Sequence, residues 1–164
     1  MSKVLSYETR ITIGDTNVMG NVYWVNFCKM FGVARELFLF ALLPKGLKPT
    51  DVLSSLGVVI ETADVNMKFL QSAFLGDNLV TNITTRNFGQ CSVEVCCEII
   101  NQDVADPKDS LLAIGSQRLV FIDTSTGKIA KIPEGLKVAA LEYEAIAPPT
   151  VLQLNLAGRY FGNI

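Results

Sequence analysis

The sequence predicts an α+β fold in which one long helix is enclosed by an antiparallel sheet. Residues 22–43 are apolar on most sides and contain no proline, which indicates a buried helix. One strand-like segment precedes this stretch, and four or more long strand-like segments follow it. A helix that is hydrophobic on most faces must be covered, and a sheet wrapped around it provides that cover.

The expected elements follow in chain order. Residues 4–13 alternate like a half-buried strand, with Tyr7, Thr9, Ile11 and Ile13 on one face. Residues 22–43 form the helix, which Pro44-Lys45-Gly46 ends, and residues 47–56 form a loop or short helix. Further strands are expected at 58–70, 77–87, 90–102 and 111–123, with a brief continuation at 129–132.

The remaining segments are short. Residues 87–89 should form a tight hairpin turn, residues 103–110 a polar loop, and residues 136–140 a helix. Residues 141–164 are expected as a packed or irregular tail. At 164 residues, the chain is expected to be a single domain, with its core at about residues 4–140.

The composition of the chain limits the classes of function that it can have. The chain is 49% hydrophobic and 18% charged, with a mean hydropathy of +0.34, so we expect apolar surface to be hidden in an oligomer interface. The net charge of −2, without a basic run, argues against nucleic-acid binding. No apolar run is long enough for a membrane helix and no signal peptide is evident, so a cytoplasmic location is expected.

The chain contains no histidine, which excludes Ser-His-Asp and Cys-His catalytic units and zinc sites that need histidine. The four cysteines lack the paired spacing of a cysteine-only zinc site, and we expect them to be reduced. Cys96 and Cys97 are neighbours and should point to opposite faces of a strand. No metal and no cofactor is expected. The chemistry of an active site would depend on carboxylates, amides, Arg, Tyr, Ser/Thr or backbone N–H groups, with a thiol less favoured.

The polar loop at residues 14–21 leads into the apolar helix, which holds the adjacent charges Arg35 and Glu36. A loop that places Asp, Asn and Gly at the mouth of a buried helix can form a small polar site in an apolar pocket. The simpler interpretation is a connection whose Asp and Asn only cap the helix.

Three motifs give a family resemblance. The pattern I-x-I-G-D-T-N-x-x-G-N-V-Y at residues 11–23, followed by A-R-E at 34–36, resembles the 4-hydroxybenzoyl-CoA thioesterase family of hotdog-fold proteins. Residues 68–77 (K-F-L-Q-S-A-F-L-G-D) are similar to that family's strand leading into P-A-x-x-G-D. The pattern V-F-I-D at 120–123, with T-G-K at 126–128 and I-P at 132–133, is similar to its last strand and turn.

The resemblance covers about residues 4–140 and implies a hotdog protomer, a long central helix wrapped by a five- or six-stranded antiparallel sheet. It also implies protomers paired edge to edge in a homodimer, often doubled to a homotetramer, with acyl-thioester sites at the dimer interface. One departure matters: the family's loop usually reads D-x-D, and the second Asp is the nucleophile or general base. This chain has Asn17 there, and an amide cannot act in that way.

The form D-T-N-x-x-G-N-V-Y, with Arg-Glu in the helix, is most similar to the enediyne (polyketide-type) thioesterases, which lack the catalytic carboxylate. By that resemblance, Asn17 and Arg35 are the catalytic pair. Arg35 is a permanent cation suited to a developing oxyanion, and Asn17 can donate a second hydrogen bond or orient water. The loop between them should let the chain fold back and bring the two side chains together. The alternative for Arg35 is a structural salt bridge to a carboxylate.

Other candidates surround this pair. Gly20 should let backbone approach the thioester, so that nearby N–H groups form an oxyanion hole. Asn21 and Tyr23 should orient the loop or line the pocket, although Tyr23 could equally be core. Substrate-binding positions are expected at Glu36, Thr62, Arg86, Gln90 and Ser92.

These five positions have different origins. Glu36 points about 100° away from Arg35 around the helix, so we expect an interface or outer role. Thr62 lies on the strand before the second motif, where it could reach the site from a partner subunit. The other three flank the hairpin turn, where family members grip the pantetheine arm, but a polar turn needs no function.

The sequence therefore predicts a thioesterase that hydrolyses an acyl or β-ketoacyl (polyketide-type) thioester of acyl carrier protein or CoA. One alternative is an aryl-CoA hydrolase acting on hydroxybenzoyl- or dihydroxynaphthoyl-type substrates. Another is a non-catalytic acyl-binding hotdog protein, because the family's Asp is missing. The expected partners are the thioester substrate and further copies of the chain, with no nucleic acid and no membrane.

Overall fold

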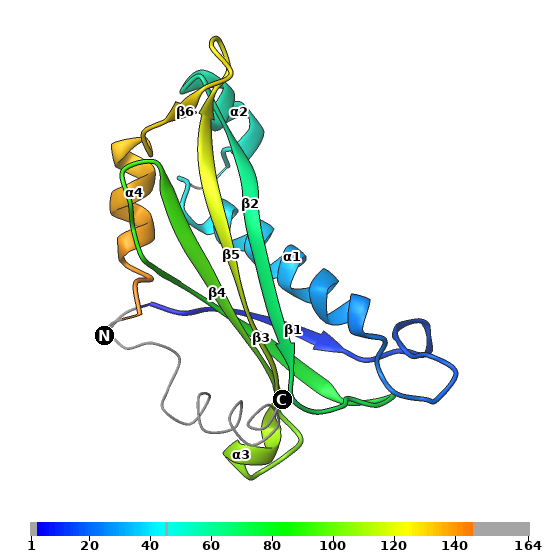
Figure 1. The fold of residues 1–164 in the computed structure, drawn as a ribbon. Helices are drawn as coiled ribbons and strands as arrows, with labels where there is room; N and C mark the ends of the chain where they lie inside the picture. Colours follow the sequence, from blue (N-terminus) through cyan, green and yellow to red (C-terminus); the bar gives the residue numbers. More distant parts are fainter. Residues whose placement is uncertain (1–2, 45, 146–164) are drawn as a thin grey trace, which may run out of the picture.

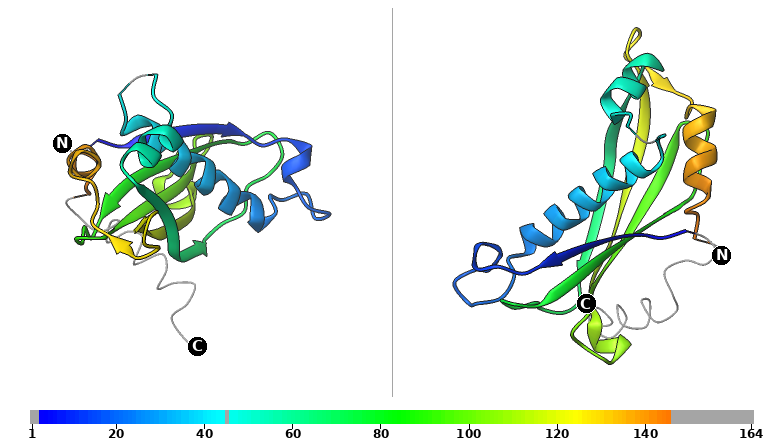
Figure 2. Two further views of the ribbon diagram at one scale, coloured as in Figure 1. Left: turned by 90° about the horizontal axis from the view of Figure 1, so that it is seen from above. Right: turned by 180° about the vertical axis from the view of Figure 1, so that it is seen from behind.

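The computed structural model describes residues 3–44 and 46–145. A long helix, α1 (Trp24–Ala41), lies across one face of a six-stranded antiparallel sheet (Figure 1). The strands are β1 (Leu5–Arg10), β2 (Val58–Phe69), β3 (Asn78–Arg86), β4 (Ser92–Asn101), β5 (Leu111–Asp123) and β6 (Ile129–Ala130). The predicted α+β class, with a long helix wrapped by an antiparallel sheet, is confirmed, and Figure 2 shows the sheet curving around α1.

The shorter helices correct two details of the prediction. They are η1 (Ile13–Asp15), α2 (Pro49–Ser55), α3 (Pro107–Ser110) and α4 (Glu134–Leu141). Ile13 was expected in the first strand, but it begins a 3-10 turn and is 80% exposed. The predicted polar loop at 103–110 contains α3, because the Asp106 carboxylate accepts a hydrogen bond from Lys108 N at 2.8 Å and caps the helix.

The order of strands in the sheet is β1-β3-β4-β5-β2, and the short β6 pairs with β5. β1 and β2 are therefore its edges in the described part of the chain. β2 is the longer edge at 12 residues, and its middle, residues 61–66, is exposed. Its pairing with β5 contains one irregularity: Thr62 lies opposite Leu119 and Asp64 opposite Arg118, so Ala63 is an extra residue, as in a β-bulge.

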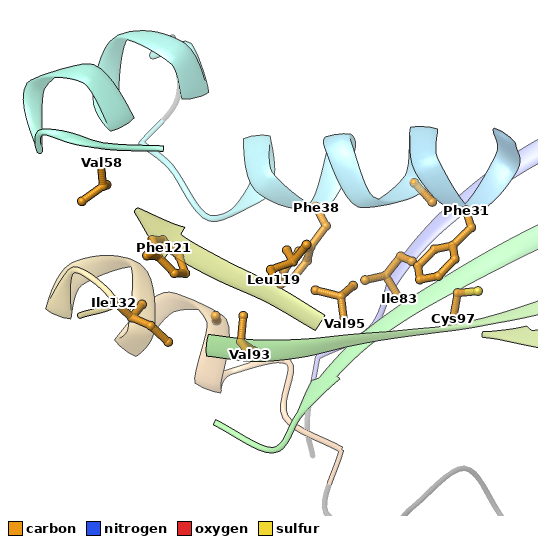
Figure 3. Close-up of a cluster of buried hydrophobic side chains, with 12 residues drawn as sticks. Phe31, Phe38, Val58, Ile83, Val93, Val95, Cys97, Leu119, Phe121 and Ile132 are labelled. Atoms are coloured by element: carbon orange, nitrogen blue, oxygen red, sulfur yellow. The ribbon is translucent and has the colours of Figure 1, made fainter. Parts of the chain in front are cut away.

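The core lies between α1 and the sheet, in two clusters that follow the length of the helix. One cluster, which extends from the middle of α1 to its C-terminal end, includes Phe31, Phe38, Val95 and Leu119 (Figure 3). The cluster around its N-terminal half includes Phe27 and Met30 with residues from β3, β4 and β5. The helix and sheet are therefore held by side chains that are apolar over nearly the whole shared surface.

Gly115 on β5 is required by the close approach of helix and sheet. A Cβ there would lie 3.3 Å from the Phe31 ring, 3.2 Å from Cys97 Sγ and 3.1 Å from the Asn66 carbonyl oxygen. Phe31 is only 1% exposed, so its ring has little room to withdraw.

The four cysteines are free thiols, as the sequence predicted. Cys97 packs in the cluster around Phe31, while its neighbour Cys96 faces the other side of β4. Burial raises the pKa of Cys96 to about 11 and that of Cys97 well above its usual value. Both thiols are therefore protonated at neutral pH and act as small apolar groups.

Most of the predicted tail at 141–164 lies outside the described residues. Its first part packs against the sheet: Thr85 N donates to the Tyr143 carbonyl and Ala145 N donates to the Thr85 carbonyl, both at 2.9 Å. The Tyr143 ring meets the Phe38 ring edge-on, with centroids 5.1 Å apart.

Candidate functional site

The polar loop is anchored to α1 by Asp15. Its carboxylate accepts hydrogen bonds from Thr12 N at 2.9 Å and Thr12 Oγ1 at 2.6 Å, which lower the pKa of Asp15. Its carbonyl accepts from Tyr23 N at 3.1 Å and from Asn26 Nδ2 at 2.8 Å. The carboxylate therefore closes on Thr12, the N-cap of η1, while the Asp15 carbonyl joins the loop to the start of α1. The N-cap of α1 is Tyr23, which makes no side-chain cap bond, so the expectation that Asp and Asn cap the long helix is wrong.

Asn17 lies at the base of a tight turn. Its N–H donates to the Asn21 carbonyl at 2.8 Å, its carbonyl accepts from Gly20 N at 2.9 Å, and its Oδ1 accepts from Met19 N at 2.8 Å. Gly20 has a φ of +81°, a conformation that glycine adopts without strain. The turn fixes the Asn17 oxygen, and within the described residues nothing accepts a bond from its Nδ2, so that donor is available.

Asn21 and Tyr23 join the loop to the rest of the protein. Asn21 forms a β-bridge with Phe74, and its Nδ2 lies 3.4 Å from Ser72 Oγ, while its buried Oδ1 has no partner among the described residues. Tyr23 is the residue before α1, is 46% exposed, and contacts the Trp24 ring with centroids 5.7 Å apart. Tyr23 is therefore a surface residue and not a core residue.

Arg35 is held by neutral oxygens. Its Nη1 donates to Thr62 Oγ1 at 3.1 Å and to Gln117 Oε1 at 3.3 Å. Its Nε is buried and has no partner among the described residues. The contact with a carboxylate is the long one from Nη2 to the exposed Glu36, at 3.9 Å. The guanidinium is thus positioned by two hydrogen bonds, both from Nη1, while the enclosed Nε has no partner among the described residues.

Gln117 is the site residue that sequence reasoning missed. It lies on β5 in phase with the buried Leu119 and Phe121, so its side chain faces α1, and it is only 8% exposed. A glutamine at an inward position of an otherwise apolar strand was the signal that could have found it. Thr62, expected as a substrate-binding residue, is brought to Arg35 by the structure.

Within one protomer the structure does not bring Asn17 and Arg35 together. Asn17 lies in the loop beyond the N-terminal end of α1 (Figure 1). Arg35 lies eleven residues after Trp24, or about 16 Å further along the helix axis. The expectation that the chain folds back over this interval is wrong for the single chain, because the loop bonds to Ala73 and Phe74 instead.

The expected pantetheine-binding residues lie around the loop between β3 and β4. Arg86 Nη2 donates to Glu94 Oε1 at 2.9 Å, and Asn87 Nδ2 donates to Glu94 Oε2 at 2.7 Å. The bond from Arg86 is the main cause that lowers the pKa of Glu94 to about 2. Gln90 is exposed, and Ser92 begins β4. The structure therefore pairs Arg86 with a carboxylate across two strands and leaves Gln90 at the surface.

An apolar cavity lies beside the Arg35 cluster. It has about 510 Å³ of empty space, part of it open to solvent. Its walls come from the end of α1, from α2 and α4, and from β2, β4 and β5, and all of its side chains are apolar; they include Phe38, Leu39, Ile60, Val95 and Leu119. Arg35, Thr62 and Gln117 do not line the cavity; they neighbour its wall residues along α1, β2 and β5.

Other kinds of site find little support in the described residues. No three Cys, Asp or Glu side chains there come together in a way that could hold a metal ion. Among residues 3–44 and 46–145, no helix has both the length and the apolar character needed to span a membrane.

Comparison with known proteins gives the family. The model of the thioesterase-like superfamily matches residues 11–140. A 1,4-dihydroxy-2-naphthoyl-CoA thioesterase from Synechocystis is 24% identical, with a TM-score of 0.72 over 85% of this chain and 96% of that chain. The dynemicin thioesterase is 21% identical, with a TM-score of 0.74 over 88% of this chain and all (100%) of that chain.

A hypothetical protein from Staphylococcus aureus, solved in complex with CoA, has a TM-score of 0.78 over 93% of each chain at 11% identity. No curated protein matches the sequence. At these identities the solved structures show the fold, which is the predicted hotdog fold. Because the family match spans residues 11–140, which is most of the chain, the protein belongs to the thioesterase-like superfamily.

Proposed function

We propose that this protein hydrolyses an acyl or β-ketoacyl thioester, and that Arg35 stabilises the oxyanion formed at the thioester carbonyl. The observation that carries the proposal is the guanidinium held by Thr62 and Gln117, with a buried Nε that has no partner among the described residues. The next residues along α1, β2 and β5 line an apolar cavity. A structural salt bridge would instead pair Arg35 closely with a carboxylate, and its contact with Glu36 is 3.9 Å long.

The reaction requires few groups. A water oxygen adds to the carbonyl carbon, and the negative charge that develops on the carbonyl oxygen is stabilised by the donors of Arg35. The carbon–sulfur bond then breaks, the thiol leaves with the proton that water has lost, and a carboxylic acid remains. Asn17 has the role of donating a hydrogen bond from Nδ2 to the oxyanion or to the attacking water, since its Oδ1 is occupied by Met19 N.

The site is shared between two protomers in this proposal. The free edge of β2 is 12 residues long and exposed in its middle, and such an edge is a template for pairing with a second chain. Two β2 edges paired about a twofold axis would also place the two α1 helices antiparallel. The loop with Asn17 of one protomer would then lie toward the Arg35-containing half of its partner's helix, which offsets the separation of about 16 Å within one chain.

A mixing experiment tests the shared site. Asn17→Ala and Arg35→Ala proteins are each expected to be nearly inactive. When they are unfolded together and refolded as a mixture, half of the dimers contain one copy of each, and each of these has one intact site. We expect about a quarter of wild-type activity to return. Failure of the mixture to regain activity, with mixed dimers demonstrated by mass spectrometry, would place both residues in one chain's site or remove one from it.

The oligomer itself is tested by sedimentation. The exposed β2 edge and the exposed Tyr23 and Trp24 predict a homodimer at least, and a homotetramer if dimers pair. A well-behaved monomer at micromolar concentration would contradict the shared site directly.

The thioester carrier is acyl carrier protein or CoA. The likeness to a naphthoyl-CoA thioesterase and to a protein solved with CoA supports CoA, and the likeness to the dynemicin thioesterase supports a polyketide-type chain. The test is a hydrolysis screen over acyl-CoA and acyl-carrier thioesters, with mass detection of the released acid. Release of acid from none of them would favour the acyl-binding alternative that Asn17 raises.

A further inference from the structure

Each of the three residues of the polar cluster leads directly into the wall of the apolar cavity. Phe38 and Leu39 follow Arg35 by three and four residues on the same face of α1. Ile60 precedes Thr62 by two residues on the same face of β2. On β5, Leu119 follows Gln117 by two residues on the same face and lines the cavity. Leu119 also lies opposite Thr62 on β2. The cavity therefore begins where the Arg35 cluster ends.

The length of the cavity can be estimated along α1 and along β5. Along α1 and the turn that follows it, the cavity wall ends at Leu43, eight residues beyond Arg35, which is about 12 Å at the rise of a helix. Along β5, it ends at Phe121, four residues or about 13 Å beyond Gln117. At the far end the cavity is bounded by Leu53 of α2, by Ile132 and by Leu136 of α4 (Ile132 and Phe121 are labelled in Figure 3).

The chemistry of the wall restricts what can enter. Among the described residues no polar side chain lines the cavity, so a hydroxyl group in it would lose its hydrogen bonds to water without gaining a side-chain partner there. A hydrocarbon chain loses nothing in this way and gains from leaving water. A hydroxyaryl group therefore fits this cavity poorly, while a β-keto oxygen would remain near the carbonyl, at the Arg35 end.

We propose that this cavity receives the tail of the acyl group and sets its length: a straight hydrocarbon chain, saturated or conjugated, of about ten carbons. An extended chain with bonds of about 1.5 Å advances roughly 1.25 Å per carbon, so the 12–13 Å of wall accommodates about nine or ten carbons beyond the carbonyl. The inference rests on the proposed thioester hydrolysis for the position of the carbonyl, but the cavity can be tested apart from catalysis.

Leu53→Trp should shorten the cavity, because Leu53 lies in its far wall. The matched control is Leu56→Trp, since Leu56 follows the same helix, is 47% exposed and is not part of the wall. For the wild type, the kcat/KM of saturated acyl-CoA thioesters should rise by about fourfold per added methylene, the value of one buried CH₂, and level off near ten carbons.

In the Leu53→Trp protein, hydrolysis of decanoyl-CoA should fall at least about tenfold, while that of hexanoyl-CoA stays within about twofold. The Leu56→Trp protein should behave as the wild type. Leu136→Ala is the second variant, since it enlarges the same end and should move the plateau to longer chains even if Leu53→Trp does not fold. An unchanged plateau in the folded variants, or a preference for 4-hydroxybenzoyl-CoA over decanoyl-CoA, would overturn the assignment.

A binding experiment tests the cavity assignment independently of the proposed hydrolysis. Calorimetric titration with decanoate and hexanoate, the free acids, needs no hydrolysis. If no thioester is hydrolysed but decanoate binds to the wild type and is lost from Leu53→Trp, the cavity assignment stands and the hydrolase proposal fails. If thioesters are hydrolysed but Leu53→Trp alters neither decanoate binding nor the chain-length profile, the hydrolase stands and the cavity assignment fails.

Discussion

Replacing Arg35 by alanine should lower kcat for the best thioester by about 100- to 1,000-fold, the usual loss when one well-placed oxyanion donor is removed. The structure explains why the loss should fall on kcat. Nη1 is engaged by Thr62 and Gln117, which fixes the guanidinium, while the buried Nε has no partner among the described residues. A preorganised donor of this kind gains most when the carbonyl oxygen acquires charge, so the KM of the variant should change much less than kcat.

The same substitution should have a modest effect on folding. It removes the hydrogen-bond donor to the buried Gln117, and an unsatisfied buried acceptor costs about 1–3 kcal/mol if it stays dry. Thr62 is exposed, so water can reach this end of the cluster and reduce the cost. For a domain of this size, each kcal/mol corresponds to about 2–4 °C in Tm.

The assay is steady-state hydrolysis, with sedimentation and circular dichroism to establish that the variant is folded and oligomeric. Arg35→Lys should recover only part of the activity, because one ammonium cannot reproduce the planar fork. The matched control is Arg118→Ala: Arg118 follows Gln117 on β5 but points to the opposite face of the sheet, and should leave activity unchanged. Near-normal turnover by folded Arg35→Ala protein would refute the catalytic role and leave Arg35 as a structural residue.

Three further predictions concern other parts of the molecule. Asn17→Asp should not be required for turnover; if the native protein is inert toward every thioester and only this variant is active, the acyl-binding alternative is correct. The lowered pKa of Glu94 means that its bond with Arg86 stabilises the fold above pH 4–5 and is lost as pH falls toward about 2. Glu94→Gln should therefore cost about 1–3 kcal/mol in denaturant unfolding at pH 7, and much less near pH 2; an equal cost at both would exclude the ion pair as the cause. Gly115→Ala should cost about 1–3 kcal/mol, because its Cβ would press on the enclosed Phe31 ring, and an unchanged Tm would show that the ring can move aside.

The fold was predictable because the buried face of each helix or strand requires apolar residues at the spacing of that element. The spacing of apolar residues predicted the helix, the strands and their order along the chain. Most of the predicted ends agree with the structure to within two residues. The differences arise from contacts between distant segments. The helix begins at Trp24 instead of residue 22 because Val22 N donates to the Ala73 carbonyl at 2.8 Å, a bond that local sequence does not encode.

The site was predictable only in part, since its residues meet through strand register. Arg35 was expected from the resemblance, but Gln117 is one polar residue in a 13-residue strand, and its importance depends on which face it occupies. Arg86 was expected to bind substrate, yet the register places it opposite Glu94. Pairing of this kind is set by the geometry of the connecting loop, where Asn87 adopts a φ of +52°, and not by the strand sequence alone.

The extra residue at Ala63 decides which side chain accompanies Arg35. Side chains along β2 alternate between the two faces of the sheet, and one inserted residue reverses that alternation for everything that follows it. In an uninterrupted register, Asp64 would lie opposite Gln117 on the side of the sheet that faces the helix. There its carboxylate would form an ion pair with the guanidinium of Arg35. Because of the bulge, Asp64 lies opposite Arg118 on the far face. A single irregularity in an edge strand therefore places the Asp64 carboxylate on the face of the sheet opposite to Arg35.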